Sequence, residues 1–155
     1  MDSLTTAQRS ERMRRVRSED TKPEMLIRRL LHRLGYRYRL HCGDLPGKPD
    51  LVFPGRSKII FVHGCFWHGH RCRSGLNKPA SNLAYWMPKL LRNKARDRKN
   101  KGLLKRLGWD VLVVWECQLG RESLARDLAA LQAPVSFSAD GRERVPMSPP
   151  AGNRR

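Results

Sequence analysis

The sequence has few acidic residues and no long apolar run. It contains 14 Asp and Glu residues against 32 Lys and Arg residues, so its formal net charge at pH 7 is +18. A charge of this size attracts polyanions, and nucleic acid is the expected partner. No apolar stretch approaches the ~20 residues that span a bilayer, and the first residues lack a signal-peptide pattern. We therefore expect a cytoplasmic protein that binds nucleic acid and has no membrane partner.

Cysteine is also scarce, and its placement is informative. Four cysteines are too few for a disulfide framework, which a reducing compartment would in any case disfavour. The segment 63–72 (HGCFWHGHRC) places two of them among three histidines. Thiolate and imidazole are the ligands that zinc prefers, and a structural site needs four. The expected zinc ligands are Cys65, His70, Cys72 and Cys117.

His68 is the alternative imidazole ligand for this site. We favour His70, because the glycine at position 69 lets the chain turn between two imidazoles that have separate roles. The fourth cysteine, Cys42, is then left as a free thiol. Four ligands would close the site and make the metal structural.

Hydrophobic periodicity predicts one α/β domain over residues 21–133. Strands are expected over 36–40, 50–53, 58–63 and 109–115, and helices over 22–34, 84–107 and 122–131. Residues 73–82 are expected to form a loop, residues 1–20 a mobile basic arm or a frayed helix, and residues 134–155 a disordered tail. The leucines of the long helix that should face a core are Leu90, Leu91, Leu103, Leu104 and Leu107. This order favours a small mixed sheet flanked by helices.

Asp50 begins a predicted strand and follows a proline. A Pro-Asp pair, followed on the next strand by an acid-x-Lys pattern, is typical of a large nuclease fold whose carboxylates hold Mg²⁺. Here Phe61 and His63 occupy the two later positions. Asp50 is therefore expected to share Mg²⁺ with a backbone carbonyl near Val62. A turn-capping role for Asp50 is the alternative.

A proton-transfer group is also needed, and His68 is the best candidate, since histidine titrates near neutral pH. The groups that could orient this histidine or the metal-bound water are His63, Glu24 and Asp97. Structural roles stay open for two of them. Glu24 has the spacing of a helix-capping residue, and Asp97 could pair with lysines on its own helix.

Aromatic residues make up 7% of the chain, and three of them occupy unusual positions. Phe66 and Trp67 fall in the predicted metal turn, and Trp86 lies at a helix start. Rings of this size can wedge between base steps, and a mismatched step costs least to open. Packing in an ordinary core is the alternative for all three.

Several segments together resemble the very-short-patch-repair endonucleases, bacterial enzymes that nick DNA at T:G mismatches left by deamination of 5-methylcytosine. These segments are Arg12-Met13-Arg14, 45–50 (LPGKPD), 63–68 (HGCFWH), 93–98 and 108–117. The resemblance covers about residues 8–131, and the segment 63–68 is its most specific part.

This resemblance implies a restriction-endonuclease-like fold, with catalytic Mg²⁺ at Asp50 and the Val62 carbonyl and with His68 in proton transfer. His63, Glu24 and Asp97 match supporting positions, and the four predicted zinc ligands match a structural zinc site. Three residues match a wedge that enters one groove of the DNA, namely Phe66, Trp67 and Trp86. Met13 of the arm, flanked by Arg12 and Arg14, matches a contact in the opposite groove.

The expected activity is a Mg²⁺-dependent nick 5′ to the thymine of a T:G mismatch, made by a monomer on double-stranded DNA. Mismatch-repair proteins are further expected partners. Two alternatives stay open at this point. One is a related nuclease of the same fold with a different DNA target. The other is a zinc-stabilised DNA-binding module without catalysis.

Overall fold

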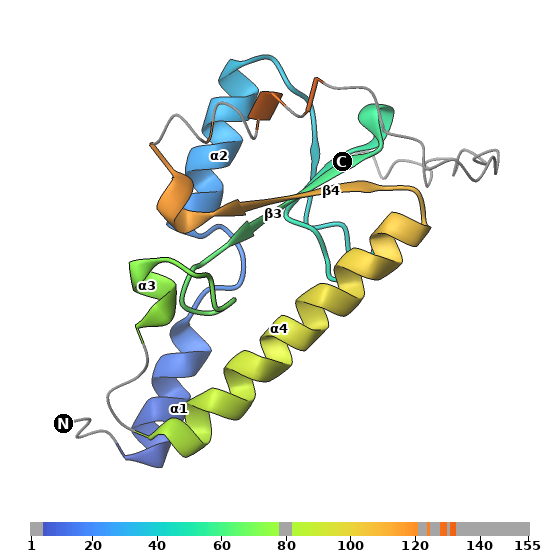
Figure 1. Ribbon diagram of the computed structural model, residues 1–155. Helices are drawn as coiled ribbons and strands as arrows, with labels where there is room; N and C mark the ends of the chain where they lie inside the picture. The colour runs from blue at the N-terminus through green and yellow to red at the C-terminus, as the bar shows by residue number, and fades with distance from the viewer. Residues whose placement is uncertain (1–4, 78–81, 121–123, 125–127, 130, 133–155) are drawn as a thin grey trace, which may run out of the picture.

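The computed structural model describes residues 5–77, 82–120, 124, 128–129 and 131–132. A four-stranded mixed sheet in the order β1-β2-β3-β4 forms its centre, and helices flank it (Figure 1). Strands β1 (Arg39–Leu40), β2 (Leu51–Phe53) and β3 (Lys58–His63) pair antiparallel, and β4 (Asp110–Trp115) pairs parallel to β3. The predicted α/β class, with a small mixed sheet flanked by helices, is confirmed.

Alternating strand residues fill two hydrophobic cores, because successive side chains of a strand point to opposite faces of the sheet. On one face the strands pack against α2 (Lys22–Arg33) through Ile27, Leu31, Leu51, Phe53, Ile60 and Val114. On the other face they pack against α4 (Leu83–Arg106) through Leu45, Val52, Ile59, Leu104 and Val111. Burial of these apolar side chains supplies the main favourable term in folding.

Helix α2 has the bounds that its sequence predicts. The Thr21 hydroxyl accepts a hydrogen bond from the Glu24 backbone N–H at 3.4 Å, and Pro23 lies in the first turn. After the helix, Gly35 adopts a left-handed φ of 87°, which glycine tolerates best. These local signals explain why the helix begins and ends where it does.

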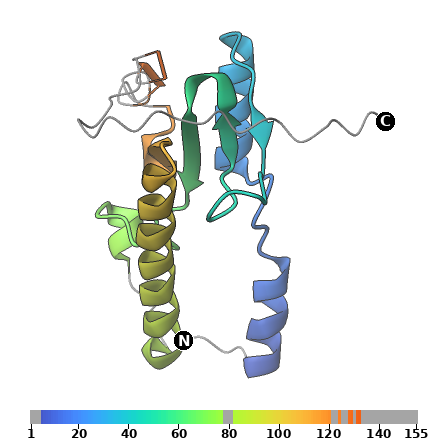
Figure 2. The ribbon, with the colours of Figure 1, turned by 90° about the vertical axis from the view of Figure 1, so that its right-hand side faces the viewer.

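Helix α4 extends well beyond the sheet (Figure 2). The prediction that its leucines face a core is therefore wrong for two of the five, Leu91 and Leu107. Leu104 is fully buried, whereas Leu91 and Leu107 are 59% and 58% exposed. Only the C-terminal part of α4 packs on the strands, so the remainder of the helix is free to line a surface.

Three other local predictions differ from the structure. The basic arm contains a regular helix, α1 (Thr6–Arg15), whose capping box pairs Thr5 with Gln8. A short helix, α3 (Arg73–Leu76), begins in the stretch expected to be a loop, and β1 is shorter than its predicted strand. Local capping explains the arm helix, since a side chain at each end of the box satisfies backbone N–H groups that the first turn leaves unpaired.

Two 3-10 turns follow strands, namely Pro54–Arg56 after β2 and Glu116–Gln118 after β4. The predicted helix over 122–131 lies largely outside the described residues, as does the whole tail from 134 to 155. Leu124, Leu128 and Leu131 are described, and all three are buried in the core beside α2. No helix in the described part of the chain is both long and apolar enough to cross a membrane.

Candidate active site and metal centre

A cleft of about 1060 Å³ lies between α1 and α4, over the C-terminal ends of β3 and β4. Figure 2 shows the two helices standing apart, and residues of both, such as Met13 and Asp97, line the cleft. The cleft lies on the same face of the sheet as α4, next to the core that contains Leu104. Phe61 and Trp115 line it. It gathers predicted site residues from separate segments of the chain, namely Met13, Asp50, Val62, His63, Trp67, His68 and Asp97.

Asp50 lies directly before β2, at the edge of this cleft. Its Oδ2 atom accepts a hydrogen bond from the Val62 backbone N–H at 2.7 Å. Burial raises the pKa of Asp50 to about 6; the Val62 hydrogen bond opposes this shift and the nearby negative Glu24 adds to it. A carboxylate that is costly to ionise here fits a hard divalent cation, which would stabilise the anion. The donor chemistry of this position therefore suits Mg²⁺.

His68, in the turn after β3, contacts Asp97 of α4. The His68 Nδ1 and Asp97 Oδ2 atoms are 2.5 Å apart, and the His68 ring stacks on His63 with 3.8 Å between centroids. Burial and the neighbouring His68 lower the pKa of His63 to about 4. Burial opposes ionisation of Asp97, yet the hydrogen bond and charge of His68, with smaller contributions from His63 and Arg96, together outweigh it and lower the pKa of Asp97. The three predicted residues thus form one cluster with His63 neutral and Asp97 charged at pH 7.

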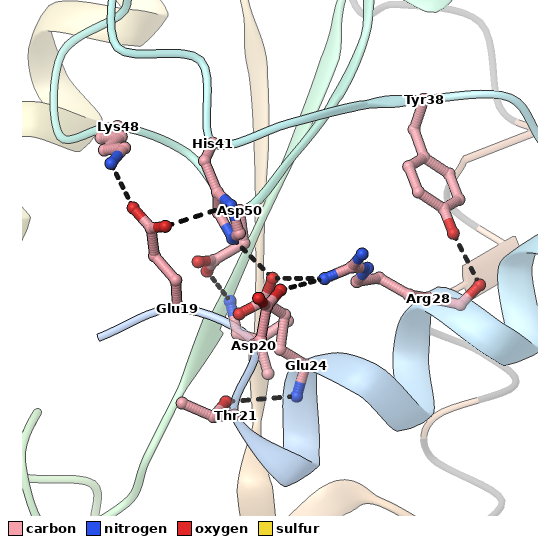
Figure 3. Close-up of polar contacts among 10 residues, drawn as sticks. Glu19, Asp20, Thr21, Glu24, Arg28, Tyr38, His41, Lys48 and Asp50 are labelled. Carbon is pink, nitrogen blue, oxygen red and sulfur yellow. Dashed lines mark hydrogen bonds and ion pairs between the residues drawn. The ribbon is translucent and has the colours of Figure 1, made fainter. Parts of the chain in front are cut away.

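Glu24 is 1% exposed and lies at the start of α2, near Asp50. Its Oε1 atom lies 2.6 Å from His41 Nε2 and 3.4 Å from Arg28 Nη1 (Figure 3). The side chain of Glu24 is thus directed to this polar network. Sequence reasoning did not find His41. The signal was the hairpin register, because the pairing of Leu40 with Leu51 puts His41 opposite Asp50.

The four predicted zinc ligands converge. The ligand atoms of Cys65, His70, Cys72 and Cys117 all lie within 4.8 Å of one another. The parallel pairing of β3 and β4 explains this, since both strands end at the same edge, with His63 opposite Trp115. Cys65 and Cys117 each follow a strand end by two residues. Three thiols and one imidazole are a ligand set suited to tetrahedral zinc.

Backbone and side-chain contacts hold this metal turn. The Cys65 carbonyl accepts a hydrogen bond from the His70 N–H at 3.0 Å, and His70 stacks on Trp115 with 4.3 Å between ring centroids. The Gly75 backbone N–H donates a hydrogen bond to Cys72 Sγ. This bond is the main cause that lowers the pKa of Cys72 to about 6, and a hydrogen bond with His70 is the second. His70 therefore lies among the cysteines and His68 lies in the cleft, as the favoured assignment requires.

The predicted wedge residues form one aromatic cluster. Phe66 lies 5.1 Å from Trp67 and 5.9 Å from Trp86 between ring centroids, so the metal turn meets the start of α4. Tyr85 extends the cluster, and Lys89 Nζ lies 5.7–5.8 Å from the rings of Trp67, Tyr85 and Trp86. The cluster therefore joins two separate segments of the chain at the end of the cleft.

The arm contributes unequally to the cleft. Met13 is half-buried and lines it, whereas Arg12 and Arg14 are exposed on α1. Arg9 lies over the Tyr85 ring, 5.8 Å from its centroid, which connects α1 to the start of α4. The predicted DNA contacts of Arg12 and Arg14 stay predictions.

The cleft is basic and contains a carboxylate suited to Mg²⁺, a His–Asp pair and an aromatic side chain, Trp67. These features are typical of DNA endonucleases. The family model for the DNA mismatch endonuclease Vsr matches residues 1–74. The type II nicking enzyme V.XorIIP of Xanthomonas oryzae pv. oryzae is 52% identical over 132 residues, which are 85% of this chain and 92% of that enzyme. The DNA mismatch endonuclease Vsr of Escherichia coli is 43% identical over 119 residues, 76% of each chain.

The type II nicking enzyme V.NmeAIP of Neisseria meningitidis is 42% identical over 126 residues, which are 81% of this chain and 89% of that enzyme. The chain belongs to the Vsr DNA mismatch endonuclease family and is a DNA-nicking endonuclease. Its substrate is DNA, and a binding module without catalysis is excluded as its function.

Proposed function

We propose that this endonuclease nicks one strand of double-stranded DNA on the 5′ side of the thymine in a T:G mismatch, with Mg²⁺ as its catalytic cofactor. The observation that carries the proposal is the position of Trp67 and His68. They are consecutive residues, and both line the cleft that contains Asp50. A ring that can open a base step thus adjoins the group that can move a proton.

Recognition is assigned to the aromatic cluster. Opening a base step costs a few kcal/mol, and this cost is lowest where the pair is mismatched. Phe66, Trp67 and Trp86 already pack against one another, so their side chains would lose little entropy on insertion. Met13, on the arm helix across the cleft, is assigned to the opposite groove. These assignments explain why a mismatched duplex would bind in preference to its matched twin.

Chemistry is assigned to the part of the same cleft that adjoins Trp67. The Asp50 carboxylate and the Val62 carbonyl are the proposed ligands of Mg²⁺, which when bound withdraws charge from a phosphate and lowers the pKa of a bound water. Asp97 accepts a hydrogen bond at His68 Nδ1, which leaves Nε2 to accept a proton from the attacking water. His63 stacks on His68 as a neutral ring and fixes its plane.

Zinc is assigned a structural role in this proposal. The site has four protein ligands, so it leaves no position for substrate. Its effect is to hold the turn that carries Phe66, Trp67 and His68 against the ends of β3 and β4. Recognition and chemistry both depend on that turn, so the metal would support both.

The test is a nicking assay on an end-labelled duplex with one T:G mismatch in a CC(A/T)GG-derived context. The matched duplex, the other mismatches in the same context, and T:G in other contexts are run in parallel, each with Mg²⁺ and with EDTA. The proposal predicts one Mg²⁺-dependent nick, on the thymine strand and 5′ to the mispaired base.

Two outcomes would contradict the proposal in different ways. Equal nicking of the matched duplex would retain the nuclease and reject the mismatch specificity, which is the alternative of a different DNA target; several relatives are named as type II nicking enzymes. Nicking that persists in EDTA would reject the Mg²⁺ requirement.

A further inference from the structure

The segment between α1 and α2 is bound to the active site by ion pairs. Glu19 pairs with Lys48, and its Oε2 atom lies 3.7 Å from His41 Nδ1. The next residue, Asp20, pairs with Arg28 of α2 at 2.5 Å (Figure 3). We call the pair Glu19-Asp20 the arm linker. Its two carboxylates connect the arm helix to residues that surround Asp50.

His41 is the centre of this network. Its Nε2 atom lies 2.6 Å from Glu24 Oε1, and its Nδ1 atom faces Glu19 of the arm linker. Its backbone N–H donates to the Asp50 carbonyl at 3.2 Å. The side chain is 15% exposed, against 2% for that of Glu24. One imidazole thus bridges a carboxylate of the linker and a buried carboxylate beside the proposed Mg²⁺ position.

The backbone is held in a costly conformation at the same place. Among the described residues, five other than glycine have a positive φ, and three of them are Asp20 (54°), His41 (45°) and Lys48 (48°). A left-handed residue of this kind costs ~1–3 kcal/mol and persists only where its surroundings enforce it. All three belong to one network, which indicates that its geometry is specifically required.

A metal is not the explanation for this cluster. Ligand atoms of Asp20, Glu24 and His41 do lie within 4.8 Å of one another. However, the Arg28 guanidinium contacts both carboxylates, at 2.5 Å and 3.4 Å. This guanidinium already offsets part of the negative charge, and His41 forms a hydrogen bond with Glu24, so ion pairs and hydrogen bonds account for the network.

We propose that His41 is a positioning residue, which orients the Glu24 carboxylate beside the Mg²⁺ position at Asp50 and connects it to the arm through Glu19. The inference rests on the proposed function, since it gives Glu24 a role at that metal position. It assigns to a single side chain both the arrangement of the active site and the attachment of the arm.

The central variants are His41→Leu and His41→Gln. Leucine removes both contacts, whereas the glutamine amide can still donate a hydrogen bond to Glu24. The matched control is His32→Leu, an exposed histidine in the last turn of α2. Thermal unfolding of all three variants establishes that the proteins compared are folded.

The first readout needs no catalysis. The Val62 amide proton donates to Asp50 Oδ2, so its NMR shift reports Mg²⁺ binding at Asp50. We expect His41→Leu to weaken Mg²⁺ binding in this titration by about 10–100-fold, the usual effect of losing a group that orients metal ligands. We expect His41→Gln to recover most of the loss and His32→Leu to match the wild type.

The second readout is the single-turnover nicking rate at a series of Mg²⁺ concentrations. We expect His41→Leu to shift the half-saturating Mg²⁺ concentration upward by the same factor. A residue with a purely structural role would lower the melting temperature and leave both Mg²⁺ curves in place. Unchanged curves for folded His41→Leu would therefore overturn the proposal.

The connection to the arm has its own test. Arg17 precedes the arm linker and is exposed, so trypsin cleavage there reports whether the linker is held. We expect several-fold faster cleavage in His41→Leu and in Glu19→Gln than in His32→Leu. Equal cleavage rates would overturn the connection through Glu19.

The failure of the proposed function is distinguishable from failure of this inference. A wild type that nicks no T:G duplex would reject the function. The Val62 titration would then still decide the role of His41, since it compares Mg²⁺ binding in two folded proteins without DNA.

Discussion

His68 Nδ1 and Asp97 Oδ2 are 2.5 Å apart, although 29 positions separate the two residues in the sequence. One belongs to the turn after β3 and the other to the middle of α4. A carboxylate at this position favours the tautomer that carries its proton on Nδ1, which leaves Nε2 as the acceptor. The pair therefore has the geometry of a general base and the group that orients it.

Replacing Asp97 by asparagine should lower the single-turnover nicking rate by about 10²–10⁴-fold, because the amide permits the wrong histidine tautomer. Duplex affinity measured in EDTA should change little. Asp44→Asn, at an exposed position outside the cleft, is the matched control and should keep the wild-type rate. A wild-type rate in Asp97→Asn would show that the contact between His68 and Asp97 does not contribute to the reaction.

Replacing Asp50 by asparagine should stabilise the metal-free protein at neutral pH. Its pKa rises from 3.8 to about 6 on folding, so above pH 6 the native state carries a carboxylate that burial disfavours. The gain should be about 3 kcal/mol, be complete above pH 6, and shrink to nothing as the pH falls toward 4. Urea unfolding at several pH values measures it.

Mg²⁺ provides the control for that measurement. Bound Mg²⁺ would stabilise the charged wild-type carboxylate and not the amide, so saturating Mg²⁺ should reduce or reverse the difference between the two proteins. A variant less stable than the wild type at every pH, with and without Mg²⁺, would contradict the assignment. The same variant should have no measurable nicking activity.

Replacing Cys117 by serine should remove the zinc site while leaving the strands themselves unchanged. We expect about one equivalent of zinc in denatured wild-type protein, clearly less in Cys117→Ser, and a melting temperature lower by about 10 °C. Cys42→Ser is the matched control, because Cys42 lies outside the cluster and should affect neither value. Full zinc content and unchanged stability in Cys117→Ser would reject this ligand set.

Replacing Trp67 by alanine should reduce the preference for mismatched over matched duplex. Losing one stacking ring costs about 1–3 kcal/mol, so the ratio of the two dissociation constants should fall by about 10-fold. Leu76→Ala removes an exposed apolar side chain, 65% exposed, from α3 and should leave the ratio unchanged. An unaltered ratio in Trp67→Ala would assign Trp67 to packing alone.

The sequence predicts this fold well where a local rule acts without competition. Strand β3 matches its prediction because a continuous apolar run has one strongly favoured form, and the bounds of α2 follow from Thr21 and Gly35. The convergence of Cys65, His70, Cys72 and Cys117 could be predicted for a similar reason, since zinc accepts few ligand types. The leucine stripe could not, because exposure of Leu91 depends on how far α4 extends past the sheet.

His41 shows the limit for the active site. His41 is not part of a sequence motif. Its proposed positioning role depends on contacts with Glu19 and Glu24, which come from separate segments of the chain. Only the pairing register of β1 and β2 indicates its place opposite Asp50. Ion pairs such as Glu19–Lys48 join residues 29 positions apart and leave no periodic signal in the sequence.

The adjacency of Trp67 and His68 has a consequence for where the backbone is cut. The two side chains leave the same turn, which is anchored on one side by Cys65 and on the other by His70. In the proposed function, Trp67 opens the base step and His68 takes the proton, so this single residue step of the protein would set the offset between the opened base step and the cleaved phosphodiester bond. Changing which mismatch is recognised would therefore leave that offset, measured in nucleotides, as it is.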